Sequence, residues 1–153
     1  TVWNRSGKAA RDLAARMDAE VATDLQAATA EAEIIATTTM SREPLIRGEW
    51  LSPGTHLDLI GAYRPDMREV DDAALQRARL FVDSRKTTIG HIGEIQIPLD
   101  SGAITPADII ADFYDLASGR YARLSDTEIT IAKNGGGAHL DLMTARYILD
   151  AAG

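Results

Sequence analysis

Short apolar runs alternate with amphipathic, Ala-rich stretches along nearly the whole chain. The first run, residues 1–4, leads into residues 6–18, where apolar side chains recur at helical spacing behind a serine cap. A short β-prone segment at 20–22 is followed by an Ala-rich helical segment at 24–32 behind an aspartate cap. The pattern therefore predicts that the chain opens with two strand-helix units.

The next apolar run, Glu33 to Thr39, contains Ile34, Ile35 and Ala36 and ends in three threonines. A continuous run of this kind is typical of a parallel strand that is covered on both faces. Further strands are predicted at 56–61, 80–83 and 128–133, and further helices at 71–79, at 105–118 and from the glycines at 135–137 through Leu149. Because strand and helix alternate, the pattern predicts an α/β fold with a doubly wound, mostly parallel sheet.

Composition narrows the class of protein. With 153 residues, of which 45% are apolar, the chain is long enough for one domain with a real core. A net charge of -7 argues against a nucleic-acid partner or an anionic membrane surface, since either needs clustered Lys and Arg. The chain has no Cys, which excludes disulfides and thiolate metal sites, and no apolar run approaches the length of a membrane span. We expect a cytoplasmic protein.

The carboxyl ends of the strands are where a doubly wound sheet binds its ligands, so their residues are the candidates for chemistry. The first end is Asn4-Arg5-Ser6. In a dinucleotide fold an acid at this position binds the ribose 2′-hydroxyl, whereas an arginine accommodates a 2′-phosphate. Arg5 therefore favours NADP over NAD, and the alternative is a helix cap beside one exposed arginine.

Two other strand ends also allow either a ligand-binding role or a purely structural one. Thr37, Thr38 and Thr39 can supply hydroxyls and amides to a pyrophosphate or ribose, although threonine is also simply a good strand residue. Asn134 with Gly135 and the next two glycines lets the backbone approach an anion at a helix start, or forms a flexible turn. The three glycines are not a phosphate-loop signature, because the flanking spacing is absent.

The remaining polar residues give weaker signals. The three histidines, His56, His91 and His139, have no ligand spacing, so a metal site is not expected. Four carboxylates near a helix start are interpreted as caps and solvated charges: Asp66, Glu69, Asp71 and Asp72. Glu94, within the segment HIGEIQ, has no partner that the sequence reveals.

Seven segments, in this order, carry a resemblance to a known family: VWNRS, ATTTMSREPLIRGEWLSPGTH, IGAYRPDMREVDD, FVDSR, GEIQIPL, DIIADFYDLASGR and EITIAKNGGGAHLDL. With these segments the chain resembles the ornithine cyclodeaminase and mu-crystallin family, which also includes Δ1-pyrroline-2-carboxylate reductases and an archaeal alanine dehydrogenase. The segments span nearly the whole chain, and their order and spacing together make the resemblance specific.

The resemblance implies that residues 1–153 are the NAD(P)-binding Rossmann domain of a two-domain, usually dimeric enzyme. It also implies that a glycine-rich motif and a substrate domain precede Thr1, so that the sheet lacks its first, central strand. We therefore expect either a gap between residues 1–4 and 33–38 or direct pairing of these two strands. The last helix, about 138–150, is expected to pack towards the substrate domain.

The resemblance also assigns residues to a site. It implies that Asn4, Arg5 and Ser6 contact the adenosine phosphate, that Thr37, Thr38 and Thr39 line the dinucleotide, and that Ile60, Gly61, Asn134 and Gly135 approach the nicotinamide. Ornithine cyclodeaminase has an acid two residues after the strand-end glycine, where this chain has Tyr63, which is expected near the substrate. A tyrosine, with an ordinary pKa near 10, is a poor base. No residue is assigned as the catalytic proton donor.

The expected function is therefore NADP-dependent reduction of a cyclic imino acid, Δ1-pyrroline-2-carboxylate, to proline, with NAD as a possible cofactor. Simple imine reduction requires less of the protein than cyclodeamination. Two alternatives stay open: an ornithine cyclodeaminase, and a non-catalytic protein that binds NADPH and a small ligand. The expected partners are a small imino or amino acid and, in the full-length protein, a second copy of the chain.

Overall fold

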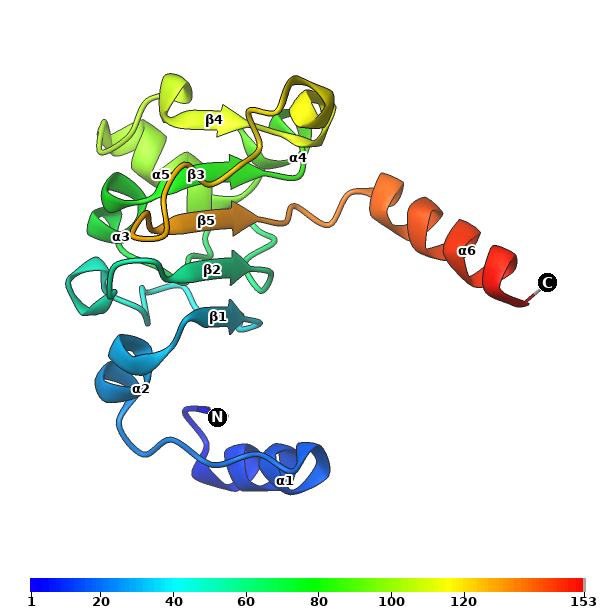
Figure 1. The fold of residues 1–153 in the computed structure, drawn as a ribbon. Coiled ribbons are helices and arrows are strands. Elements are labelled where there is room, and N and C mark those ends of the chain that lie inside the picture. Colours follow the sequence, from blue (N-terminus) through cyan, green and yellow to red (C-terminus); the bar gives the residue numbers. More distant parts are fainter. Residues whose placement is uncertain (153) are drawn as a thin grey trace.

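A five-stranded, wholly parallel sheet forms the centre of the molecule in the computed structural model, which describes residues 1–152 (Figure 1). Across the sheet the strands lie in the order β1 (Ile34–Thr37), β2 (His56–Leu59), β5 (Thr130–Lys133), β3 (Arg79–Val82) and β4 (Ile109–Ala111). Neighbouring strands pair in parallel, with His56 opposite Ile34 and Thr130 opposite His56. The expected α/β class with a parallel sheet is thus confirmed.

The hydrophobic core lies against the middle strands. Leu57 and Leu59 of β2 and Ile131 of β5 are fully buried. Helix α3 (Asp72–Arg77) adds Leu75 to the same cluster, and α5 (Gly93–Ser101) adds Ile95. Strand β5 is the middle strand of the five. Its neighbouring residues Thr130 and Ile131, which point to opposite faces of the sheet, are both buried.

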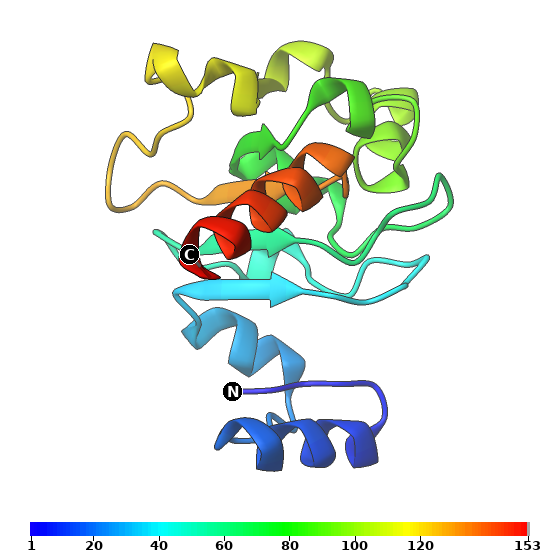
Figure 2. The ribbon, with the colours of Figure 1, turned by 90° about the vertical axis from the view of Figure 1, so that its right-hand side faces the viewer.

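Residues 1–22 form a separate unit beside the sheet, whereas the helix at 25–31 packs against the core through Leu25. Helix α1 (Gly7–Met17) is capped by Ser6, and α2 (Leu25–Glu31) is capped by Asp24, as the sequence predicts. The strands expected at 1–4 and 20–22 are reduced to one isolated parallel bridge between Val2 and Val21. Figures 1 and 2 show this bridge segment and α1 lying apart from β1.

Strand β1 is an edge strand, and this corrects the expectation that it is covered on both faces. Its only ladder partner within residues 1–152 is β2. The side chain of Ile34 is 71% exposed, and Ala36 is also exposed. An edge strand leaves one row of backbone groups without a ladder partner. Of the two arrangements expected for residues 1–4 and 33–38, the structure has the gap and not the direct pairing.

The single helix expected at 105–118 is wrong. The structure instead has two 3-10 helices, η2 (Pro106–Asp108) and η3 (Phe113–Ser118), with strand β4 between them. Ile109 and Ile110 are β-branched, and Ile109 is buried where it pairs with Leu80 of β3. Asp112 then caps η3, which ends the strand. Packing against β3 has thus overridden the helical pattern.

Three further short elements were not expected from the sequence: η1 (Gly48–Trp50), α4 (Arg85–Thr88) and α5. Pro98 lies inside α5, and a proline is an unfavourable residue in a helix interior, so the sequence pattern concealed this helix. Within residues 1–152 we find no helix with the length and apolar content needed to cross a membrane.

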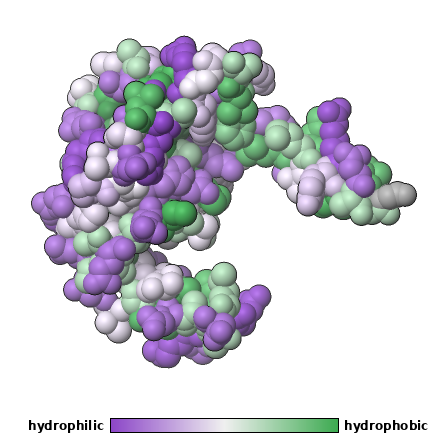
Figure 3. Space-filling model, in the orientation of Figure 1, coloured by the Kyte–Doolittle hydropathy of each residue, from purple (hydrophilic) through white to green (hydrophobic). Residues whose placement is uncertain are grey.

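The last helix, α6 (Ala138–Ala152), extends away from the carboxyl end of β5 (Figures 1 and 3). None of its described residues is buried. Five of its large apolar side chains are more than half exposed: Leu142, Met143, Tyr147, Ile148 and Leu149. Helix α6 therefore contributes little to the core that the other elements form.

A matched pair of substitutions tests this division of the core. Ile131→Ala removes a fully buried side chain from the central strand, whereas Ile148→Ala removes one that is 60% exposed. In this 153-residue chain we expect Ile131→Ala to lower the free energy of unfolding by about 2–5 kcal/mol and Ile148→Ala to change it by less than about 0.5 kcal/mol, measured by urea unfolding. Equal losses would contradict the described packing.

Candidate functional site

The carboxyl edge of the sheet brings together three of the four predicted site clusters. The first cluster lies at the end of β1, with Thr37 as its last residue and Thr38 and Thr39 just after it. The second, Ile60 and Gly61, follows β2, and the third, Asn134 and Gly135, follows β5. These three strands are adjacent in the sheet. The backbone N–H groups of Ile60 and Gly61 both donate to the carbonyl of Thr37, at 2.9 and 3.0 Å. The N–H of Asn134 donates to the carbonyl of Leu59 at 3.0 Å. The three strand ends therefore form one continuous rim.

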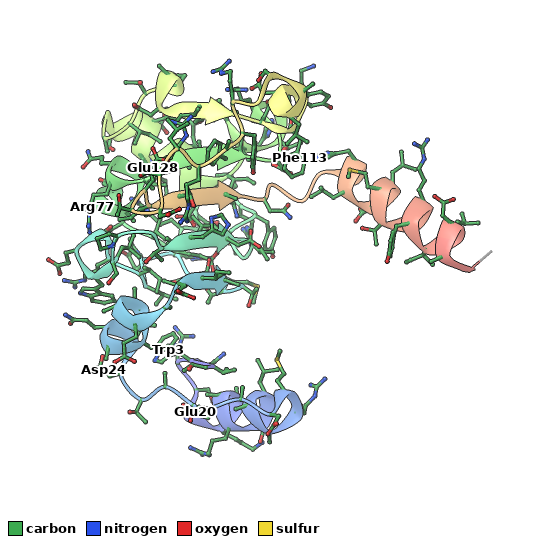
Figure 4. The ribbon with its side chains drawn as sticks, viewed as in Figure 1. Trp3, Glu20, Asp24, Arg77, Phe113 and Glu128 are labelled. Carbon is green, nitrogen blue, oxygen red and sulfur yellow. The ribbon has the colours of Figure 1, made fainter. Side chains whose placement is uncertain are left out.

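The fourth cluster, Asn4-Arg5-Ser6, lies in the N-terminal unit at the start of α1. The Ser6 hydroxyl accepts from the N–H of Ala9, and the Asn4 side chain accepts from the N–H of Ser6 at 2.8 Å. The guanidinium of Arg5 is exposed and makes no hydrogen bond or ion pair within residues 1–152. Figure 4 shows that Trp3, which precedes Asn4, also lies in this unit, apart from the sheet. The structure therefore does not bring this cluster into contact with the rim.

A fully buried carboxylate, that of Glu69, lies beneath the rim. One of its oxygens, Oε1, accepts from both the N–H and the hydroxyl of Thr39, at 2.6 and 2.7 Å. The other, Oε2, accepts from the Thr37 hydroxyl at 2.8 Å and from the N–H groups of Gly61 and Ala62 at 2.9 and 3.3 Å. One side chain therefore binds the segments that follow β1 and β2.

Gly61 is required by this arrangement. A Cβ atom at this position would collide with the backbone of Thr39 and with the Glu69 carboxylate. The strand-end glycine that the sequence marks is thus explained by the close approach of three groups.

Glu69 is itself held by a second buried acid, Glu94, in α5. The Glu94 carboxylate accepts from the N–H groups of Glu69 and Val70, at 2.6 and 3.1 Å. Burial raises the pKa of Glu94 to about 7, although these two N–H groups act in the opposite direction. Glu94 therefore exchanges its proton near neutral pH, although it lies inside the protein.

Lys133, at the end of β5, supplies the positive charge near these two acids. It is 1% exposed, and its Nζ donates to the carbonyl of Leu59 at 3.0 Å. Burial lowers the pKa of Lys133, and the nearby carboxylates of Glu94 and Glu69 oppose this shift. The buried side of the rim thus contains two acids and one base that partly compensate one another.

Asp83 and His139 form a second polar pair at the same edge. Asp83 directly follows β3, and its Oδ1 accepts from the N–H of Ser84 at 2.7 Å and from the hydroxyl of Thr87 at 3.3 Å. Its Oδ2 lies 3.8 Å from Nε2 of His139, and neither atom has a hydrogen-bond partner within residues 1–152. The rings of His139 and Phe113 are nearly perpendicular, with their centroids 6.2 Å apart. Figure 4 places Phe113 near the start of α6. This pair brings the start of α6 close to β3.

A hollow of about 460 Å³ lies at the opposite, amino end of the sheet, lined by residues 30–34, 52–56, Arg123 and Asp126. Because ligands of parallel sheets sit beyond the carboxyl ends of the strands, we do not assign the ligand to this hollow. Within residues 1–152 no group of three or more His, Asp or Glu side chains is arranged to hold a metal ion.

The interpretation of Glu69 as a cap or solvated charge is wrong, because it is fully buried. The same interpretation holds for Asp71, which caps α3 by accepting from the N–H of Ala74 at 2.9 Å. Sequence reasoning also missed the roles of Glu94, Lys133 and Asp83. For Glu94 a signal existed, because this acid lies between Ile92 and Ile95 in a largely apolar segment.

The outer side of the rim has the groups that a dinucleotide needs. Thr38 is exposed, and Asn134 is partly exposed, so that hydroxyl and amide groups can bind phosphate or ribose oxygens. Ile60 and Tyr63 are 42% and 58% exposed and can contact a planar ring or a small substrate. The rim thus offers polar groups after β1 and β5, with Ile60 between them after β2.

Comparison with known proteins gives a family match. The model of the ornithine cyclodeaminase/mu-crystallin family matches residues 1–153. The Δ1-pyrroline-2-carboxylate reductase of Paracoccus denitrificans is 54% identical over 154 residues, which cover 97% of this chain and 49% of that protein. The chain thus spans about half the length of the curated relatives it matches.

Two solved structures are similar to this fold. The Δ1-pyrroline-2-carboxylate reductase of Thermococcus litoralis, in complex with NADH and L-proline, is 28% identical with a TM-score of 0.86, over 94% of this chain and 47% of that one. An archaeal alanine dehydrogenase dimer with bound NAD is 31% identical with a TM-score of 0.87, over 98% of this chain and 48% of that one.

The raised pKa of Glu94 predicts a specific dependence of stability on pH. A carboxyl group whose pKa is higher in the folded state stabilises that state below its unfolded pKa, near 4.5, and this stabilisation is lost as the pH rises through about 7. The loss amounts to about 3 kcal/mol. We therefore expect the free energy of unfolding of Glu94→Gln, relative to that of the unaltered chain, to rise by up to this amount between pH 4.5 and 8.

Urea unfolding at a series of pH values measures this difference. Glu43→Gln, which alters an exposed carboxyl group, is the control and should run parallel to the unaltered chain. The readout is the change with pH, so it is independent of any constant cost of placing an amide opposite two N–H groups. Parallel curves for Glu94→Gln as well would contradict the prediction.

Proposed function

Because the chain belongs to the ornithine cyclodeaminase/mu-crystallin family, we propose that the complete gene product is a nicotinamide-dependent reductase of a cyclic imino acid. The proposed reaction takes Δ1-pyrroline-2-carboxylate to proline. The observation that carries this proposal is the 54% identity to a reductase of that name, together with the rim of polar strand ends at the carboxyl edge of the sheet.

The rim residues would bind and orient the cofactor. A reduced nicotinamide cofactor supplies the hydride, which adds to the imine carbon, while the imine nitrogen takes a proton. Thr37, Thr38 and Thr39 would line the dinucleotide, and Ile60-Gly61 and Asn134-Gly135 would approach the nicotinamide end. By fixing these segments in advance, the protein lowers the entropic cost of bringing the hydride donor to the substrate.

The proposed cofactor is NADPH, and the reason is Arg5. The cluster that follows Val2 contains an exposed arginine and no acid, which suits a 2′-phosphate better than a free 2′-hydroxyl. The reductase structure from Thermococcus litoralis contains NADH, and the archaeal alanine dehydrogenase structure contains NAD. NADH is therefore the alternative cofactor, and its use must be compared with that of NADPH by experiment.

Tyr63 favours reduction over cyclodeamination. Its exposed phenol follows Gly61 by two residues, where the resemblance places an acid in ornithine cyclodeaminase. A phenol is a poor base at neutral pH, and cyclodeamination requires assisted attack and loss of ammonia. Imine reduction requires only orientation and a proton source, which this site can provide more simply.

The exposed apolar side chains of α6 fit a place in a larger protein. Its five exposed apolar side chains would pack towards a substrate domain in the complete gene product, which we propose to be a cytoplasmic homodimer. One relative, the archaeal alanine dehydrogenase, is described as a dimer.

An activity assay tests the proposed reaction. We expect the purified complete gene product to oxidise NADPH when Δ1-pyrroline-2-carboxylate is added, followed by the loss of absorbance of the reduced nicotinamide, and to form proline. Release of ammonia from ornithine would instead favour the cyclodeaminase. Binding of NADPH with no turnover of either substrate would favour the non-catalytic alternative and contradict the proposal.

A charge reversal tests the choice of cofactor. Arg5→Asp should shift the ratio of kcat/KM for NADPH to that for NADH towards NADH by about tenfold or more, because it replaces a partner of the 2′-phosphate with a partner of the 2′-hydroxyl. Arg16→Asp makes the same change of charge at the far end of α1 and should leave the ratio within about twofold. An unchanged ratio in Arg5→Asp would remove Arg5 from the site.

A further inference from the structure

We propose that Glu69 is a positioning residue for the nicotinamide dinucleotide: its buried carboxylate holds the segments after β1 and β2 in the arrangement that binds the cofactor. This inference rests on the proposed function, and it assigns a role to a residue on the buried side of the rim rather than on its exposed side. Glu69 does not touch the reacting atoms; it acts through Thr37, Thr39 and Gly61.

The regular pairing of β1 with β2 ends at Thr37 and Leu59. Past these residues the N–H groups of Ile60 and Gly61 still donate to the carbonyl of Thr37, but within residues 1–152 no backbone hydrogen bond joins residues 38–41 to residues 60–63. Glu69 accepts five hydrogen bonds from Thr37, Thr39, Gly61 and Ala62, which lie in these two segments. Hydrogen bonds to an ionised acceptor are roughly twice as strong as neutral ones. One carboxylate thus replaces the ladder at the point where the ligand is proposed to bind.

The position of Glu69 is fixed independently of these two segments. Its N–H donates to Glu94, and its carbonyl accepts from the N–H groups of Leu45 and Ile46 at 2.8 and 3.0 Å. The next residue, Val70, forms a parallel bridge with Ile46. Because two other segments, residues 45–46 and α5, hold the backbone of Glu69 and Val70, the position of the Glu69 carboxylate does not depend on the strand ends that it binds.

A glutamine cannot replace this carboxylate. Each of the two oxygens accepts from at least one backbone N–H, Oε1 from Thr39 and Oε2 from Gly61 and Ala62. In either orientation of an amide, its NH₂ group would therefore face a backbone donor. Glu69→Gln has nearly the same size as the native residue, but it must release one of the two segments.

Asp71 provides a matched control. It lies two residues away, and its carboxylate also accepts from two backbone N–H groups, those of Gly48 and Ala74, at 2.8 and 2.9 Å. One of these bonds caps α3 and the other holds the start of η1, and neither involves the segments after β1 and β2. Asp71→Ala, which removes both bonds, should therefore reduce stability without altering the rim.

The experiment measures NADPH binding and steady-state kinetics in the complete gene product. We expect Glu69→Gln to raise the Kd and the KM for NADPH about tenfold or more, while kcat at saturating NADPH changes less than about threefold. Glu69→Asp, which keeps the charge but is one methylene shorter, should give an intermediate Kd. Asp71→Ala should leave the Kd within about twofold of the unaltered protein, and the urea midpoints of all variants are compared.

Three results would overturn the inference. An unchanged Kd in Glu69→Gln would show that the rim does not depend on Glu69. An equal rise of the Kd in Asp71→Ala would show that general destabilisation is the cause. If Glu69→Gln does not fold, Glu69→Asp becomes the test, and a Kd equal to that of the unaltered protein would then overturn the inference. Failure of the unaltered protein to bind either NADPH or NADH is a separate result, which contradicts the proposed function itself.

Discussion

The carboxylate of Glu69 imposes a constraint that the rest of the carboxyl edge satisfies. A buried carboxylate is costly unless it is surrounded by donors, and here backbone N–H groups and two threonine hydroxyls from separate segments supply them. This requirement explains why Gly61 has no side chain and why threonines stand at positions 37 and 39. It also fixes the segments that follow β1 and β2 relative to each other.

The charges around Glu69 explain how the constraint is tolerated. Glu94 fixes the backbone of Glu69 by accepting from its N–H, and Lys133, whose Nζ donates to the carbonyl of Leu59, supplies a positive charge near the acids. Burial raises the pKa of Glu94 to about 7, so that one of the two acids is partly protonated near neutral pH and the burial of two negative charges is avoided. Buried networks of this kind favour one arrangement of the backbone when every member is satisfied.

The sequence predicts the parallel α/β sheet and the three clusters of the rim because both depend on local pattern: apolar runs, strand-end threonines and glycines. It could not predict Glu69, because the fixing of this acid depends on Glu94, 25 residues away in a helix that Pro98 conceals. The same limit applies to Ile109 and Ile110, where pairing with β3 decides between helix and strand. Whether Ile34 is covered depends on a neighbour of β1, which local pattern does not reveal.

Hydrogen exchange with and without NADPH tests the central claim most directly, namely that the carboxyl edge is the cofactor site. In the complete gene product, mass spectrometry of peptides covering residues 37–41, 60–63 and 134–137 should show slower exchange when NADPH is bound. Peptides covering residues 52–55 and 123–126, which line the hollow at the amino end, should be unchanged. Slower exchange confined to the peptides of that hollow would contradict the account.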